Sequence, residues 1–261
     1  MAFTVHAVMP GVWHIVDCMG VCMTLLEGEN AAMLVDTGYG IEDVADFMRH
    51  MTDLPLTVFL THNHHDHAMG ARCFPETYML EADMADWRMF TNDEMRRRVL
   101  TQAIGKNLTV DEKTFLAGEI PLPKVMKPGV IDLGGLTAEI IEAPGHTPGS
   151  AVVYVPERKL LLSGDDWNPC TWLFFPQALG LREYRSNMRG IQQLPFEKVL
   201  CPHREALYDR WMFDDFFNAL TDGNLRAAEP VNIAPYEQID TCQATLPHDQ
   251  VFVFDWAKSG L

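Results

Sequence analysis

Residues 61–67 of this chain read THNHHDH, its most informative stretch. Four of the chain's ten histidines lie in these seven positions, beside one aspartate. Histidine is the commonest metal ligand in proteins, and carboxylates bind the same ions. A solvated loop that collected histidines by chance is the simplest alternative, but the density of ligand-type side chains favours a metal site.

The residues on either side of this run predict how its side chains point. Residues 56–60 have the composition of a buried strand, and side chains alternate in direction if the chain stays extended beyond it. The side chains that would then share one side are those of His62, His64 and Asp66. Asn63 and His65 would face away, and a helical turn at residues 68–71 would bring His67 back toward the same centre.

The composition bounds the class of protein. A chain of 261 residues, 48% hydrophobic and 21% charged, is typical of one large globular domain or two small ones. The net charge of −16 argues against nucleic acid or anionic membranes as partners, since binding them needs clustered Lys and Arg. No apolar run reaches the length of a membrane-spanning helix, and the first residues lack a secretion signal. We therefore expect a cytoplasmic protein that acts on a small molecule.

The six cysteines form no CxxC pair and no repeated spacing, which favours reduced thiols. Each is expected to be a small buried apolar residue. Cys170 and Cys201 stand close to other ligand-type residues, so a further role is left open for these two.

Short strands alternate with helices along most of the chain, which predicts a layered α/β protein. A hairpin turn is expected at residues 27–30. The expected division is a main domain at residues 1–228 and a C-terminal extension at 229–261, irregular apart from one strand, that packs on it. The expected strands are residues 12–16, 21–27, 31–36, 56–60, 131–133, 137–142, 151–155, 159–162, 198–201 and 251–254, and the expected helices outside the insertion described next are 41–51, 182–194 and 209–220.

Residues 82–118 differ from the rest of the chain because they are rich in methionine and have helical apolar spacing. Two helices and a third near residues 111–116 are expected. Methionine makes an adaptable apolar surface, so this insertion would form a lid or a pocket wall; packing on the outer face or in a homodimer interface is the alternative. The three arginines at 96–98 read as a solvated helix face, with contact to an anionic substrate as the alternative. The aromatic residues of 167–175 would form a pocket floor or a buried loop.

Three more polar residues come directly after predicted strands. They are His146 after strand 137–142, Asp165 after strand 159–162, and His203 after strand 198–201. In layered α/β folds, loops at strand ends carry functional side chains over a rigid sheet. Each residue alone reads as a turn or cap residue, but four strand ends that all supply metal-type ligands form a joint signal. The neighbouring Asp166 reads as a surface or loop residue without a role.

These motifs, in this order, resemble the metallo-β-lactamase superfamily. The resemblance rests on the HxHxDH run at 62–67, His146 in Gly-His-Thr-Pro-Gly, Asp165 in Ser-Gly-Asp, His203, and Asp36 in Val-Asp-Thr-Gly. It implies a four-layer αββα sandwich with two metal ions at one edge. It further implies that one metal is held by His62, His64 and His146, the second by Asp66, His67 and His203, and that Asp165 bridges the two. Asp36 would orient the histidine loop.

The activity implied is that of a binuclear metal-dependent hydrolase. Two divalent cations that share a water lower its pKa, and the bridging hydroxide attacks a carbonyl-centred bond in a thioester, ester or lactone. Asp66 would be the catalytic side chain that steers this nucleophile. A thiolate-free set of imidazoles and carboxylates suits zinc first, with iron or manganese as alternatives.

Two features of the sequence narrow the choice among the members of this superfamily. Asp165 at the bridging position, where the commonest zinc β-lactamases have a cysteine, is similar to glyoxalase II and to lactonases. A glutathione thioesterase would carry a basic C-terminal region, whereas Lys258 is the one lysine or arginine of residues 229–261.

The alternative function is an iron-dependent redox enzyme of the sulfur dioxygenase or flavodiiron type. Flavodiiron proteins, however, carry a carboxylate where this chain has His64, and a fused flavin domain.

Overall fold

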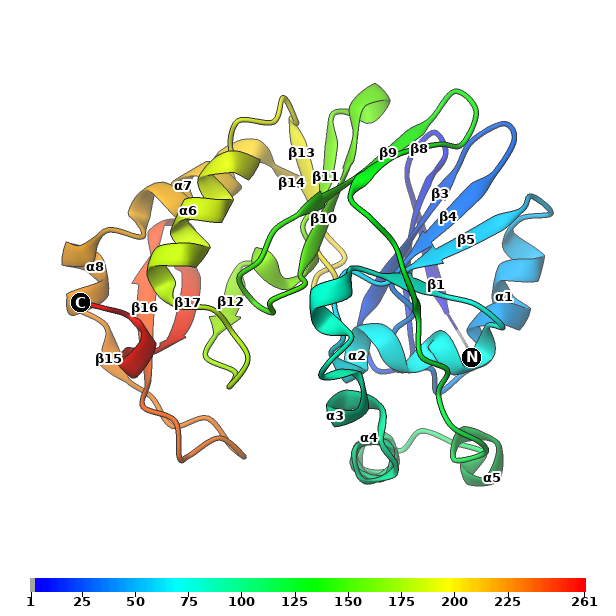
Figure 1. Cartoon of the computed structure of the whole chain (residues 1–261), viewed down its shortest axis with the longest axis horizontal. Helices are drawn as coiled ribbons and strands as arrows, with labels where there is room; N and C mark the ends of the chain where they lie inside the picture. The colour runs from blue at the N-terminus through cyan, green and yellow to red at the C-terminus, as the bar shows by residue number, and fades with distance from the viewer. Residues whose placement is uncertain (1–2) are drawn as a thin grey trace.

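Two mixed sheets pack face to face in the computed structural model, which describes residues 3–261 (Figure 1). In spatial order the first sheet contains β1 (Thr4–Met9), β2 (Val12–Val16), β3 (Cys22–Glu27), β4 (Ala32–Val35), β5 (Leu56–Phe59), β6 (Tyr78–Met79) and β7 (Lys124–Val125). The second contains β14 (Tyr208–Asp209), β13 (Lys198–Leu200), β11 (Leu160–Leu162), β10 (Ala151–Val155), β9 (Thr137–Glu142) and β8 (Gly129–Asp132).

Apolar side chains from both sheets fill the space between them. Val35 and Phe59 of the first sheet belong to one buried cluster with Ile140, Val153 and Leu162 of the second. Branched and aromatic side chains fit a pleated surface that is buried on one face or both, which is why these short runs form strands. The central strands β4 and β10 are buried at every residue, so the two sheets form a rigid support for the loops at their ends.

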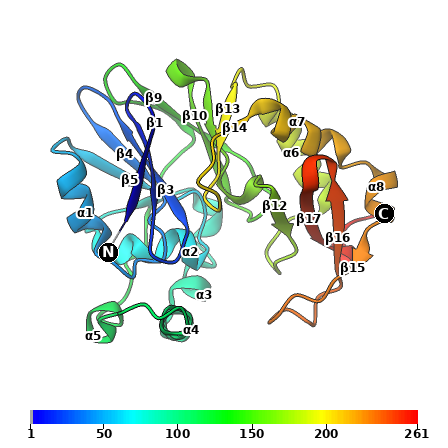
Figure 2. The same ribbon diagram turned by 180° about the vertical axis from the view of Figure 1, so that it is seen from behind.

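Helices cover the outer faces of the two sheets (Figures 1 and 2). α1 (Val44–Met51) buries Val44, Ala45 and Met48 against the first sheet, and the side chain of Asp43 caps its first turn. α6 (Leu181–Ile191) and α7 (Arg210–Ala219) cover the second sheet, with α8 (Asp222–Arg226) beyond them. These layers confirm the αββα sandwich. Within residues 3–261, none of the helices has the length and apolar run needed to cross a bilayer.

The order of the strands brings the ligand-bearing loops to one edge. β4 and β5 are parallel with Val35 opposite Phe59, so Asp36 and the histidine run leave the first sheet side by side. β11 and β13 are parallel with Leu162 opposite Leu200, so Asp165 and His203 leave the second sheet together. β9 and β10 form an antiparallel pair whose connecting loop carries His146. Loops from both sheets therefore meet at this edge.

The insertion consists of helices, as the apolar spacing predicts. They are α3 (Trp87–Thr91), α4 (Asp93–Gly105) and α5 (Glu112–Phe115). The reading of residues 96–98 as a solvated face is wrong for Arg96, whose side chain is 1% exposed. Its guanidinium donates to the carbonyls of Phe115, Ala117 and Gly118. Arg96 thus satisfies the carbonyls at the end of α5 and holds that turn against α4.

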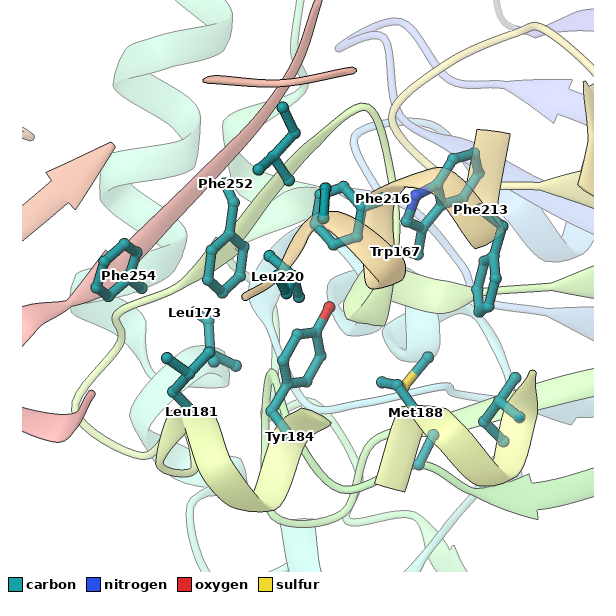
Figure 3. Packing of buried hydrophobic residues seen from close by; sticks show 14 of the residues in the cluster. Trp167, Leu173, Leu181, Tyr184, Met188, Phe213, Phe216, Leu220, Phe252 and Phe254 are labelled. Carbon is teal, nitrogen blue, oxygen red and sulfur yellow. The ribbon is translucent and has the colours of Figure 1, made fainter. Parts of the chain in front are cut away.

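The expectation of a largely irregular segment after Glu229 is wrong, because a third sheet forms there. Its strands, in spatial order, are β12 (Cys170–Leu173), β17 (Gln250–Asp255), β16 (Thr241–Leu246) and β15 (Glu229–Pro230). β16 alternates polar and small residues, a weak strand pattern, and acquires its order by pairing with β17 from Thr241 to Leu246. Figure 3 shows Phe252 and Phe254 of β17 in the cluster that contains Tyr184 of α6 and Phe216 of α7.

Phe252→Ala is expected to lower the free energy of unfolding by about 3–5 kcal/mol, because the fully buried ring leaves a cavity between β17 and the helices. Urea denaturation would measure this loss as a lower midpoint with an unchanged slope. Val130→Ala is the control, since the Val130 side chain is 67% exposed and its truncation should cost less than about 0.5 kcal/mol. Equal midpoints for the two variants would contradict the prediction.

Candidate metal centre

Two tight turns bring Asp36 and the histidine run together. Asp36 has φ of 65° directly after β4, and its Oδ1 accepts from the backbone N–H of Thr61 at 2.7 Å. Gly40 has φ of 62°, and a Cβ there would lie 2.5 Å from the Cα of Gly70. A side chain at Gly40 would therefore separate the loop after Asp36 from the turn after His67.

The structure brings all seven predicted ligand side chains together. They form three overlapping groups with ligand atoms within 4.8 Å of one another: His62, His64 and His146; His62, His67 and Asp165; and Asp66, His67 and His203. Asp165 lies between the other side chains. Its Oδ2 is 3.5 Å from His146 Nε2 and 3.0 Å from His203 Nε2, and its Oδ1 is 3.5 Å from His67 Nε2.

Four of the histidines make a hydrogen bond through the ring nitrogen that points away from the centre. The outward contacts are His62 Nδ1 to Thr61 Oγ1 at 3.0 Å, His67 Nδ1 to Asp36 Oδ2 at 2.9 Å, His146 Nδ1 to the carbonyl of Trp172 at 2.7 Å, and His64 Nε2 to the amide of Gln177 at 2.6 Å. A hydrogen bond at one ring nitrogen orients the ring and presents the other nitrogen. His64 therefore faces the centre with Nδ1, and His62, His67 and His146 face it with Nε2.

Several atoms at the centre are buried without a hydrogen-bond partner among residues 3–261. They are His62 Nε2, His67 Nε2 and Asp165 Oδ1. Buried polar atoms are normally paired, and an unpaired group costs about 1–3 kcal/mol. The unpaired atoms belong to the same overlapping groups, so the residues fit bound metal ions. Imidazole and carboxylate donors without thiolate suit zinc, iron or manganese.

Three histidines of the centre are neutral, whereas its two carboxylates are ionised. Burial lowers the pKa of His62, His64 and His146, which keeps these imidazoles neutral as metal ligands must be. Burial alone would raise the pKa of Asp66, but the charges of His67, His65 and His203 outweigh it and lower the pKa to about 2. The same balance lowers the pKa of Asp165, where His203 and His67 outweigh burial. Both carboxylates are therefore ionised.

The local backbone differs from the extended chain expected after β5. α2 (His65–Ala68) begins directly after His64, whose carbonyl accepts from the N–H groups of His67 and Ala68 at 3.0 and 2.9 Å. Asp66 therefore reaches the centre from the first turn of a helix. Asn63 faces away as predicted, but His65 lines the cavity over the centre, with its ring 5.5 Å from that of Tyr39. His65 still belongs to none of the three ligand groups.

Two buried carboxylates behind the ligands were not found from the sequence. Asp166 is fully buried, not a surface residue, and its Oδ1 accepts from the backbone N–H of His146 at 3.0 Å. Asp83 accepts from the N–H of Asn63 at 3.1 Å and from the hydroxyl of Thr147 at 2.7 Å. Burial raises the pKa of Asp83 to about 6. Asp83 therefore links the histidine run to the His146 turn, a role that only the folded chain reveals.

A cavity of about 520 Å³ opens onto the ligands. The helical insertion supplies one wall with Phe90, Met95 and Val99, and the C-terminal segment adds Tyr236. Trp172 and Phe175 also line the cavity, whereas Trp167 and Phe174 are buried in the protein interior, so the aromatic segment serves both expected roles. The insertion is thus a pocket wall; its movement as a lid stays a prediction.

The cysteines lie outside the ligand groups. All six are free thiols. Cys201 is buried, and burial raises the pKa of its thiol. Cys170 lines the cavity but belongs to none of the ligand groups found in residues 3–261.

Comparisons with known proteins find similar sequences and similar folds. The sequence profile of the metallo-beta-lactamase superfamily matches residues 16–203. The acyl-coenzyme A thioesterase MBLAC2 of Gallus gallus is 26% identical in an alignment of 202 residues that covers 69% of this chain and 70% of that protein. The linear primary-alkylsulfatase of a Pseudomonas species is 23% identical over 54% of this chain, but this match spans only 32% of the alkylsulfatase. A solved metallo-beta-lactamase from Pontibacter korlensis superimposes with a TM-score of 0.59 at 18% identity, covering 83% of this chain and 97% of that one.

Proposed function

The chain belongs to the metallo-beta-lactamase superfamily and is a metal-dependent hydrolase, and from this premise we propose that it cleaves a carbonyl-centred bond, first among them an acyl thioester, at a two-metal centre. His62, His64 and His146 would hold one ion, and Asp66, His67 and His203 the other. The observation that carries the proposal is the position of Asp165. One of its oxygens lies within 3.5 Å of both His146 and His203, which belong to the two different triads.

The protein's own residues prepare the reaction. When bound, a pair of divalent cations supplies an acidified water and polarises the carbonyl oxygen of the substrate. Asp66, which is ionised and lines the cavity, would orient the attacking water by accepting its hydrogen bond. Asp36 holds the ring of His67 and the backbone of Thr61, which keeps the histidine run in place.

An apolar acyl thioester is the substrate class that the cavity favours. Phe90, Met95, Val99 and Phe175 give it an apolar wall close to the ligands. The relative named as an acyl-coenzyme A thioesterase supports the same class. A glutathione thioester is disfavoured, because an enzyme that binds glutathione would need basic side chains in its C-terminal region. The one basic residue of residues 229–261, Lys258, instead donates to the carbonyls of residues 175, 176 and 178.

Metal analysis followed by a substrate panel tests the proposal. Protein expressed with zinc, iron or manganese is expected to hold two ions per chain by mass spectrometry and to hydrolyse acyl thioesters. Lactones and alkyl sulfates complete the panel, and an oxygen electrode checks the redox alternative. One ion per chain, or consumption of oxygen without hydrolysis, would contradict the proposed function.

A further inference from the structure

A second hollow of about 250 Å³ adjoins the cavity over the metal ligands. Phe90, Met95, Arg98, Phe175 and Tyr236 line both spaces. The second hollow extends beyond this shared wall to Met89, on the surface of α3. The two spaces are therefore neighbours that share these side chains, which come from the helical insertion, the segment at residues 175–177 and the C-terminal segment.

The side chains that line both spaces are mainly aromatic, and two of them contact a proposed metal ligand. The ring of Phe90 lies 4.5 Å from that of His64, and the ring of Phe175 lies 4.7 Å from it on centroids. Phe175 in turn packs edge-on against Tyr236 at 5.4 Å. A substrate whose reactive carbonyl sits at the ligands could thus extend an apolar chain along these aromatic rings.

The metal cavity has more polar side chains than the second hollow, where Asn92, Glu94, Arg98 and Gln177 lie beside the apolar ones. Gln102, Asn168 and Arg204 line the metal cavity but not the second hollow. In the second hollow the charged groups are Glu94 and Arg98, which pair with each other at 2.7 Å on the exposed rim. The polar leaving group of a substrate therefore fits the metal cavity, and an apolar chain fits the second hollow.

We propose that the second hollow is the subsite for the acyl chain of the substrate, with Met89 and Met95 as its adaptable apolar surface. The proposal rests on the proposed function. Methionine is flexible and polarisable, so this subsite accepts straight chains of different length. The protein then prefers medium or long acyl thioesters to acetyl thioesters.

Met89→Trp tests the subsite, because a larger ring would fill the hollow from its exposed end. We expect the ratio of kcat/KM for decanoyl-CoA to that for acetyl-CoA to fall roughly tenfold. Ile104→Trp is the matched control: Ile104 is 52% exposed on the neighbouring helix and lines neither space, so the ratio should not change. An unchanged ratio in Met89→Trp, or a wild-type protein indifferent to chain length, would overturn the proposal.

A binding measurement separates this proposal from the proposed function. Calorimetry with decanoic acid should give weaker binding to Met89→Trp than to Ile104→Trp, whether or not thioesters are cleaved. Equal binding by both variants would count against the subsite even if hydrolysis occurs. Absence of thioesterase activity with weaker binding by Met89→Trp would reject the reaction and keep the subsite.

A separate observation concerns the amide of Gln177. His64 Nδ1 lies 2.9 Å from His146 Nε2, so His64 Nε2 points outward to the Gln177 amide at 2.6 Å. Gln177 Oε1 is buried without a partner among the described residues. A neutral imidazole that binds a metal through Nδ1 carries its proton on Nε2. A half-turn of the amide places Oε1 against that proton and satisfies both groups. We infer that Gln177 accepts from His64 Nε2–H and is a positioning residue for this ligand.

Metal affinity, rather than activity, tests this role, because Gln177 also lines the second hollow. Gln177→Met keeps the shape but removes the acceptor, and chelator competition should show roughly 10–100-fold weaker zinc binding. Gln177→Glu keeps an acceptor and should bind zinc at least as tightly as the wild type. Wild-type affinity in Gln177→Met, or an equal loss in both variants, would overturn the inference.

Discussion

Asp165→Ala should lose its metal and its hydrolytic activity together, with kcat/KM lower than that of the wild type by on the order of 10³-fold or more. The side chain of Asp165 lies against His67, His146 and His203, which come from separate loops. Without it, three histidines remain around a space that has lost its central negative charge. Mass spectrometry for metal content and thioester hydrolysis measured on the same preparation check the two losses.

His65→Ala is the matched control for metal content. His65 lies in the same heptapeptide but belongs to none of the ligand groups, so this variant should keep two ions per chain. Asp165→Ala protein that still holds two ions would show that this carboxylate does not join the two triads. Loss of metal from His65→Ala would show that the ligand set is assigned wrongly.

Removal of the metals is expected to lower the melting temperature by about 16–32 °C. Binding at a thousand times the dissociation constant stabilises the folded state by about 4 kcal/mol at each of the two sites, and each kcal/mol shifts the transition by about 2–4 °C in chains near this length. The physical reason is that the metal-free centre leaves His62 Nε2, His67 Nε2 and Asp165 Oδ1 buried and unpaired. Bound cations would satisfy all three.

Calorimetry before and after dialysis against a chelator measures this shift, and added zinc should restore it. The same treatment of Asp165→Ala should give a much smaller shift, because that variant binds metal weakly at the start. A wild-type transition that is indifferent to the chelator would mean that the cluster does not hold a metal in solution.

The clustering of the seven candidate ligands could be predicted from the sequence because their signals are local. A dense run of histidines needs no partner to be noticed, and strands β9 and β10 have the predicted bounds because their alternating or continuous apolar patterns are strong. Strand ends then located His146, Asp165 and His203, since loops at strand ends carry functional groups.

The remaining features depend on contacts that only the folded chain makes. Arg96 reads as one of three exposed arginines until the end of α5 supplies the carbonyls that it binds. Asp166 reads as a loop residue until the turn before β10 places the N–H of His146 against it. β16 is a weak strand by pattern and forms by pairing with β17. The start of α2 at His65 depends on the carbonyl of His64, which periodicity does not reveal.

Each proposed triad takes ligands from both sheets. His62 and His64 follow β5 and meet His146 from the β9–β10 loop, and Asp66 and His67 meet His203, which follows β13. The distance between the two sheets therefore affects the distances between the ligands of each triad, and with them the rate of the reaction. Substitutions in the interior between the sheets, such as Leu162→Ala, would alter turnover by shifting one half of the centre against the other, so variants selected for a new substrate should accumulate changes in that interior as well as around the cavity.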